Sequence, residues 1–75
     1  MNALTLIDLK LGQEAHIVAL KNNVSGIPEK LIAMGVLPGK KIALVKSFPA
    51  YVFQIGHSQF SVDKDIAHSI VIKTS

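Results

Sequence analysis

The chain has 75 residues, no cysteine and a net charge of +3, which comes from eight lysines against five acidic residues. This length predicts one domain, residues 1–75, and the absence of cysteine excludes disulfides and thiolate metal sites and favours a reducing, cytoplasmic compartment. No apolar run reaches the roughly 18 residues of a membrane-spanning helix, and the N-terminus lacks the basic region of a signal peptide, so we expect a soluble chain.

The lysines are scattered along the chain, and arginine is absent. This distribution favours a solvated surface over a continuous track for phosphates. A small basic barrel that binds nucleic acid is the alternative. Single-strand binders need aromatic side chains on one exposed face, and the alternation of Tyr51, Phe53 and Phe60 favours the core instead. We therefore expect no nucleic acid as a partner.

The first half of the chain predicts a strand and a short helix. Residues 4–12 have a mixed apolar spacing that predicts a short strand or turn across the core. Residues 14–21 have a β-branched centre and predict a strand, and residues 22–26, rich in Asn, Ser and Gly, predict a loop. A helix is expected over residues 27–34, where Pro28 suits the first turn. One face of this helix carries Ile27, Leu31 and Met34.

The stretch MGVLPG, residues 34–39, predicts two changes of chain direction. Gly35 is expected to end the helix as the left-handed residue of a Schellman motif, with Val36 packing on the helix. Residues 37–40 predict a type II turn, because proline suits its second position and glycine its third. We interpret four residues as this structural motif: Met34, Gly35, Pro38 and Gly39.

The second half of the chain predicts mainly strands. A strand is expected over residues 40–48, a hairpin over 51–57 and 59–63, one helical or 3₁₀ turn over 63–69, and a last strand over 70–73. A curled sheet would cover its own edges and enclose an aliphatic core. The predicted fold class is mainly β, a small five-stranded barrel with one short α-helix between the first and second main strands.

Three stretches together follow the pattern of a known family, namely LxxLxxGxxAxI near the start, the helix with MGVLPG, and the C-terminal segment. The residues that carry this pattern are Leu6, Leu9, Gly12, Ala15, Ile17, Leu31, Met34, Gly35, Pro38, Gly39, Asp65, Ala67, Ile70 and Ile72. The sequence resembles the FeoA family of ferrous iron transport accessory proteins, and this implies an SH3-like barrel, a fold that also forms the C-terminal domain of some iron-dependent repressors. The sequence differs from the family pattern in two places. Lys30 stands where the helix usually has an arginine, and the apolar Pro49-Ala50-Tyr51-Val52 stands where the family has a Gly-Asp-Pro-like turn.

The resemblance implies a small bacterial accessory protein that is not an enzyme. It would lie in the cytoplasm, contact the cytoplasmic part of the ferrous iron transporter FeoB, and reach the inner membrane through this partner. Partner contacts are expected at Leu37, Phe48, Tyr51 and Val52, because the stretch around residues 48–53 is unusually apolar for a connection. The alternative is that these side chains complete the core, and self-association is another use of an exposed apolar patch.

Two groups of imidazole and carboxylate side chains are candidates for a metal site. Glu14 and His16 lie two residues apart on one strand face, and Asp65 and His68 lie three apart near Asp63. These ligand types suit Fe(II) or another divalent transition metal. Scattered His and Asp residues are more often solvated, so we expect no tightly bound cofactor and at most weak binding of a divalent metal.

Overall fold

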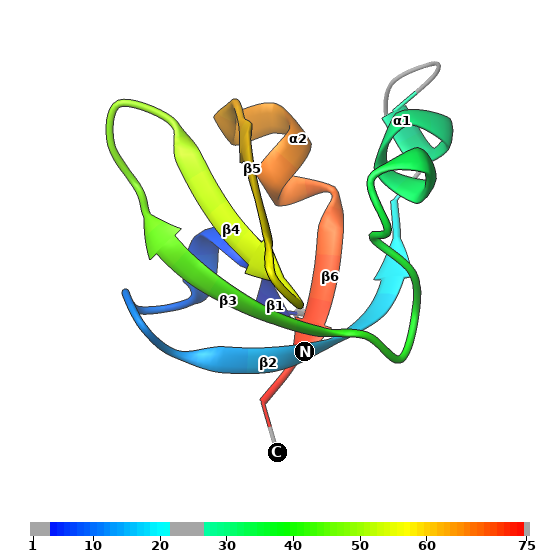
Figure 1. The fold of residues 1–75 in the computed structure, drawn as a ribbon, viewed down its shortest axis with the longest axis horizontal. Coiled ribbons are helices and arrows are strands. Elements are labelled where there is room, and N and C mark those ends of the chain that lie inside the picture. The colour runs from blue at the N-terminus through cyan, green and yellow to red at the C-terminus, as the bar shows by residue number, and fades with distance from the viewer. Residues whose placement is uncertain (1–3, 22–26, 75) are drawn as a thin grey trace.

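The structure, a computed structural model, describes residues 4–21 and 27–74 (Figure 1). The predicted loop over residues 22–26, and the side chains of Ile27 and Pro28, lie outside this description. The described elements, in chain order, are β1 (Leu4–Thr5), the 3₁₀ turn η1 (Leu6–Asp8), β2 (Glu14–Leu20), α1 (Ile27–Ala33), β3 (Lys41–Lys46), β4 (Tyr51–Ile55), β5 (Ser58–Val62), α2 (Lys64–His68) and β6 (Ile70–Lys73). Within the described residues, no helix is long and apolar enough to cross a membrane.

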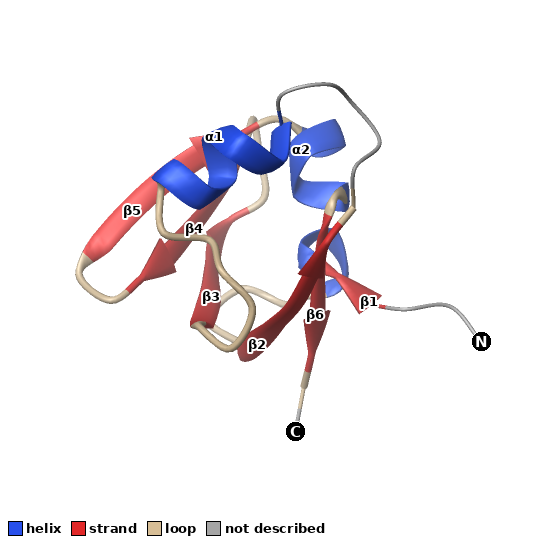
Figure 2. Cartoon of the chain, turned by 90° about the vertical axis from the view of Figure 1, so that its right-hand side faces the viewer, coloured by secondary structure: helices blue, strands red, loops and turns tan. Residues whose placement is uncertain are grey.

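The six strands form one antiparallel sheet with the order β1-β6-β2-β3-β4-β5. The mainly β class and the helix between the first two main strands are confirmed. The sequence predicted five strands in a closed barrel, whereas the sheet has a sixth strand, the two-residue β1, and its edge strands β1 and β5 are not paired with each other. Figure 2 shows the curled sheet with both helices over the same end.

The core is aliphatic apart from Phe53, as the composition predicts. Along β2 the side chains of Ala15 and Ile17 are buried while those of His16 and Val18 are exposed, the alternation of a strand with one face on the core. The buried hydrophobic residues are Leu6, Leu9, Ala15, Ile17, Leu31, Val36, Ile42, Leu44, Phe53, Val62, Ala67, Ile70 and Ile72.

The stretch after α1 folds as the sequence predicts. The amide of Val36 donates to the carbonyl of Leu31 at 2.9 Å and the amide of Gly35 to that of Ile32 at 2.9 Å, which are the two hydrogen bonds of a Schellman motif. Gly35 has a φ of 91°, in the left-handed region that glycine adopts without a β-carbon clash. Val36 and Leu31 are both buried in the core.

The type II turn follows directly. The amide of Lys40 donates to the carbonyl of Leu37 at 3.1 Å, and Gly39, with a φ of 92°, occupies the third position of the turn. The amide of Gly39 also donates to the carbonyl of Ile17 at 2.7 Å, and the amide of Ile17 donates to the carbonyl of Lys40 at 2.9 Å. The turn is therefore fixed to β2 as well as closed on itself.

The helical turn predicted over residues 63–69 is α2, and its first turn is capped. The Asp63 side chain accepts a hydrogen bond from the amide of Ile66 at 2.9 Å, the usual role of an N-cap carboxylate. Ala67 is buried, and Ser69 donates its hydroxyl to the carbonyl of Ile66 at 2.6 Å. These bonds hold a helix that is too short to be stable alone.

Candidate partner-binding surfaces

The first candidate metal pair, Glu14 and His16, lies on the exposed face of β2. The Glu14 carboxylate is 3.8 Å from the ammonium of Lys41, so it forms an ion pair at the surface. His16 is the register partner of Lys41 on β3 and of Lys73 on β6. Directly opposite residues in a sheet have neighbouring side chains, so two cationic side chains flank this imidazole and oppose the binding of a metal cation.

The second candidate group belongs to α2. The Asp63 carboxylate caps this helix, and Asp65 and His68 occupy exposed positions along it. The two candidate groups therefore lie on different elements, β2 and α2. In the parts of the chain that the structure describes, no three His, Asp or Glu side chains are grouped closely enough to hold a metal ion.

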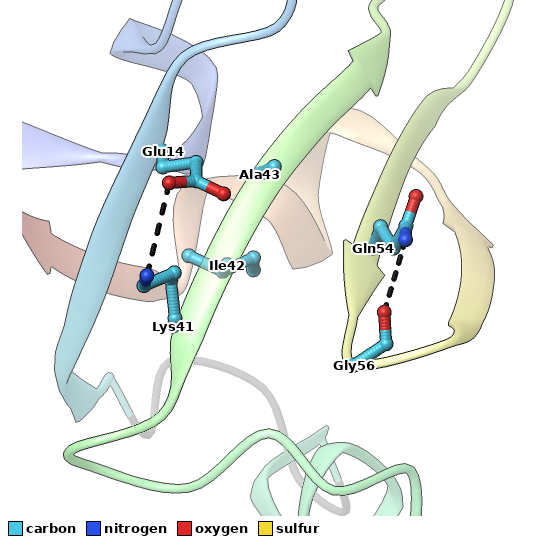
Figure 3. A pocket seen from close by; sticks show the side chains of 6 residues that line it. All are labelled: Glu14, Lys41, Ile42, Ala43, Gln54 and Gly56. Carbon is cyan, nitrogen blue, oxygen red and sulfur yellow. Dashed lines mark hydrogen bonds and ion pairs between the residues drawn. The ribbon is translucent and has the colours of Figure 1, made fainter.

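A shallow pocket of about 340 Å³ lies over β3 (Figure 3). Figure 3 shows the pair of Glu14 and Lys41 on one side of the strand and Gln54 with Gly56 on the other. The Gln54 side-chain amide donates to the carbonyl of Gly56 at 2.9 Å and accepts from Gln59 at 3.2 Å. The polar groups of this pocket are thus paired with one another, since the two ionisable side chains of its lining, Glu14 and Lys41, form the surface ion pair.

The aromatic side chains of the β4–β5 hairpin pack in the core or against it. Phe53 is fully buried, and its ring centroid lies 5.6 Å from that of Phe60, which is half-buried like Tyr51. The core interpretation of these three residues is confirmed. They do not form the exposed row of rings on which single-stranded nucleic acid stacks.

The predicted partner residues in the connection from β3 to β4 differ in exposure. Phe48 has 85% of its surface exposed and precedes a cis peptide bond to Pro49. Tyr51 and Val52 are half-buried at the start of β4, and Tyr51 packs against the core. Each of the two interpretations, an exposed partner site and a completed core, therefore holds for a different residue. Phe48 projects into solvent, whereas Tyr51 contributes to the core.

Leu37 lies in a second apolar region, which we call the helix-end surface and define as Val18, Ile32 and Leu37. The exposed fractions of these side chains are 47%, 50% and 37%. Ile32 belongs to α1 and Leu37 opens the turn that is hydrogen-bonded to β2, the strand that carries Val18. The sequence analysis did not predict Val18 and Ile32 as partner residues. The position of Ile32 could have been predicted, because it does not lie on the helix face that carries Leu31 and Met34 and should therefore point outward.

The helix-end surface and Phe48 lie at different ends of the molecule. In Figure 1 the helix α1 is on the right, and the connection between β3 and β4 projects at the upper left. The four predicted partner residues therefore do not form one continuous surface. Any single partner must either span the molecule or use one end of it.

The curled antiparallel sheet, with two small helices over one end and apolar side chains exposed at two ends, defines a small β domain of the SH3-like class. The family model of the FeoA domain matches residues 4–74. The chain belongs to the FeoA family, which is associated with ferrous iron transport.

Several solved structures share this fold. Stenotrophomonas maltophilia FeoA complexed with zinc has a TM-score of 0.86 at 22% identity, over 95% of this chain and 91% of that chain. Iron(II) transport protein A from Clostridium thermocellum has a TM-score of 0.84 at 30% identity, over 95% of this chain and 45% of that chain. No significant match is found among the curated proteins.

The fold also occurs inside larger regulators. IdeR from T. acidophilum has a TM-score of 0.88 at 19% identity, over 100% of this chain and 35% of that chain. The chain thus corresponds in fold to about a third of this protein. The predicted family resemblance and the predicted link to the metal-dependent repressors are both confirmed.

Proposed function

We propose that residues 1–75 form a single accessory domain that acts in the bacterial cytoplasm, catalyses no reaction itself, and binds the cytoplasmic part of a FeoB-type ferrous iron transporter. The family match over residues 4–74 carries this proposal, because it links the chain to ferrous iron transport. The S. maltophilia relative is described as an SH3 domain protein and as a candidate ferrous iron transport activating factor.

We place the protein contact on the helix-end surface. Leu37 is held in a turn that is closed by its own hydrogen bond and joined to β2, so its backbone is already ordered before binding and little conformational freedom of the loop is lost. Ile32, half exposed on α1, adds apolar area beside the same helix end. Burial of apolar area depends little on ionic strength, so binding should weaken only slightly when salt is raised.

A capture experiment tests this assignment. The tagged chain is incubated with the purified cytoplasmic part of the transporter at two salt concentrations, as wild type and as Leu37→Asp. Phe48→Asp is the matched control, because it places the same charge on an exposed apolar residue at the other end. Loss of capture in Leu37→Asp alone supports the assignment, and equal capture by all three proteins contradicts it.

The same experiment separates an adaptor from a nucleic-acid binder. A chain that binds through its lysines would lose affinity steeply with salt, because each neutralised phosphate releases counterions. Recovery of nucleic acid from a cell extract, with this salt dependence and no effect of Leu37→Asp, would overturn the proposal. Formation of a dimer that Leu37→Asp disrupts would instead assign the surface to self-association.

We further propose that iron is the cargo of the partner rather than a cofactor of this chain. The lysines beside His16 and the separation of the two candidate groups support weak metal binding at most. Fe(II) titration, described below, tests this part of the proposal.

A further inference from the structure

We propose that the chain binds anionic lipid membranes directly through a tip surface, which we define as Lys10, Leu11, Lys46 and Phe48. This contact needs no transporter. It lies at the end of the molecule away from the helix-end surface, so the two contacts are independent of each other.

Leu11 projects from a turn that is fixed to the sheet. The amide of Gln13 donates to the carbonyl of Lys10 at 3.0 Å, and the Gln13 side chain accepts from the amide of Lys10 at 3.0 Å. The amide of Gly12 donates to the carbonyl of Leu44 on β3 at 2.8 Å. The turn over residues 10–13 is therefore held against the last part of β3, with Leu11 at its apex.

Phe48 projects from the next connection on the same side. β3 ends at Lys46, two residues beyond the strand position that binds the turn, and Phe48 follows in the connection to β4. Figure 1 shows both loops at the same end of the molecule, where β2 begins, β3 ends and β4 begins. The two loops that carry Leu11 and Phe48 therefore lie at the same end of the sheet.

These are the two most exposed large apolar side chains in the described residues, with Phe48 at 85% and Leu11 at 63% exposure. Leucine and phenylalanine side chains that enter the boundary between lipid headgroups and acyl chains gain the free energy of apolar burial. A fluid surface receives two separate projections without a matching shape, whereas a protein partner would need two matching pockets. The form of the tip surface therefore favours a lipid surface as its occupant.

The charges around the tip surface favour anionic lipid. Lys10 and Lys46 are exposed beside the two apolar residues, and the whole chain carries a net charge of +3. Lysines next to a membrane can extend their ammonium groups to the headgroups and are attracted to anionic lipids. In this arrangement Leu11 and Phe48 insert into the membrane, and the lysines select anionic lipid.

Acidic side chains near the tip surface limit this attraction. Glu14 directly follows the turn over residues 10–13 and is paired with Lys41 at 3.8 Å. The Asp8 carboxylate accepts from the amide of Thr5 at 2.8 Å. Asp63 follows Val62, the register partner of Tyr51 at the start of β4, and its carboxylate caps α2. The carboxylates of Asp8 and Asp63 are engaged with the backbone of their own segments, but their negative charge remains, so apolar insertion should carry most of the binding.

Co-sedimentation with lipid vesicles tests the proposal. The full chain is mixed with vesicles of phosphatidylcholine and phosphatidylglycerol in a 3:1 ratio, and with vesicles of phosphatidylcholine alone. We expect binding to the mixed vesicles, an affinity lower by about tenfold or more in Phe48→Ser or Leu11→Ser, and loss of measurable binding in the double variant. Replacing Lys10 and Lys46 by Gln should lower the affinity for the anionic vesicles by roughly fivefold for each lysine.

Two matched controls lie on α1. Ile32→Ser removes an exposed apolar side chain, and Lys30→Gln removes an exposed lysine, both away from the tip surface. Neither should change vesicle binding. All these changes are at exposed side chains, and urea denaturation checks that each variant is folded.

Four outcomes would overturn the proposal. Wild-type protein that stays in the supernatant with anionic vesicles shows that the surface does not bind lipid. An equal loss of binding in Ile32→Ser shows that the attachment is not specific to the tip. Unchanged vesicle binding by the double Leu11 and Phe48 variant shows that these side chains do not insert into the membrane. If no vesicle binding is found and Phe48→Ser loses capture of the purified transporter part, the tip surface is a contact for the transporter instead.

Discussion

The substitution Gly35→Ala tests how the helix end fixes the fold. Gly35 has a φ of 91°, and a β-carbon built there would meet no atom within 4 Å. The cost of alanine is therefore local and comes from the left-handed backbone, about 1–2 kcal/mol. A lower entropy of the unfolded alanine chain offsets roughly 0.4–1 kcal/mol of this, so the expected net loss is on the order of 1 kcal/mol.

This loss is large for so small a domain, because a chain of 75 residues is expected to have a free energy of unfolding of about 4–11 kcal/mol. Urea denaturation followed by far-UV circular dichroism measures it, and with a slope of about 1 kcal/mol per M the midpoint should fall by about 1 M. Gly35→Asn is the control, since asparagine tolerates the left-handed region better than alanine does. An unchanged midpoint in Gly35→Ala, or a larger loss with asparagine than with alanine, would refute the role assigned to this glycine.

Three further predictions concern the cap of α2, the core and iron. Asp63→Ala removes the carboxylate that accepts a hydrogen bond from the first turn of α2, and it should lower the free energy of unfolding, measured by urea denaturation, by about 0.5–2 kcal/mol. Asp63→Asn is the control, because asparagine can also cap the helix and should retain most of the stability. Phe53→Ala removes the largest fully buried side chain and should cost about 3–5 kcal/mol, enough to leave much of the protein unfolded by circular dichroism. Anaerobic calorimetry with Fe(II) should show no tight saturable site, and a single such site that is lost in His16→Ala or His68→Ala would contradict this expectation.

The local parts of the fold were predictable because each rests on neighbours in sequence. The end of α1, the turn through Pro38 and Gly39, and the β4–β5 hairpin all follow from residues whose backbone preferences are strong and whose partners are a few positions away. The structure places these elements where the sequence pattern predicts them. The hydrogen bonds that end α1 and close the turn link residues three to five positions apart, namely Gly35 to Ile32, Val36 to Leu31 and Lys40 to Leu37.

The parts that the sequence did not predict depend on contacts between distant segments. The sequence predicted a short strand or a turn over residues 4–12 but did not count it among the five strands of the sheet. Leu4 and Thr5 form β1 because they pair with Ile72 and Val71 near the other end of the chain. The exposure of Phe48 likewise depends on how far the β3–β4 connection extends from the sheet. An apolar residue in a connection is compatible with a core or a surface position, and only the arrangement of the strands decides between them.

The two exposed surfaces allow one molecule to contact a protein and a membrane at the same time. The principal extents of the chain are 29, 27 and 22 Å, and Figure 1 places α1 and the β3–β4 connection at different ends. Substitutions at well-separated sites without shared partners usually have additive effects. Leu37→Asp should therefore weaken capture of the transporter part and leave vesicle binding unchanged, Phe48→Ser should do the reverse, and the double variant should show the sum of the two losses. A double variant that deviates from this sum by more than about 0.5 kcal/mol in either assay would show that the two surfaces are coupled, and that the ends of the molecule do not act as separate contacts.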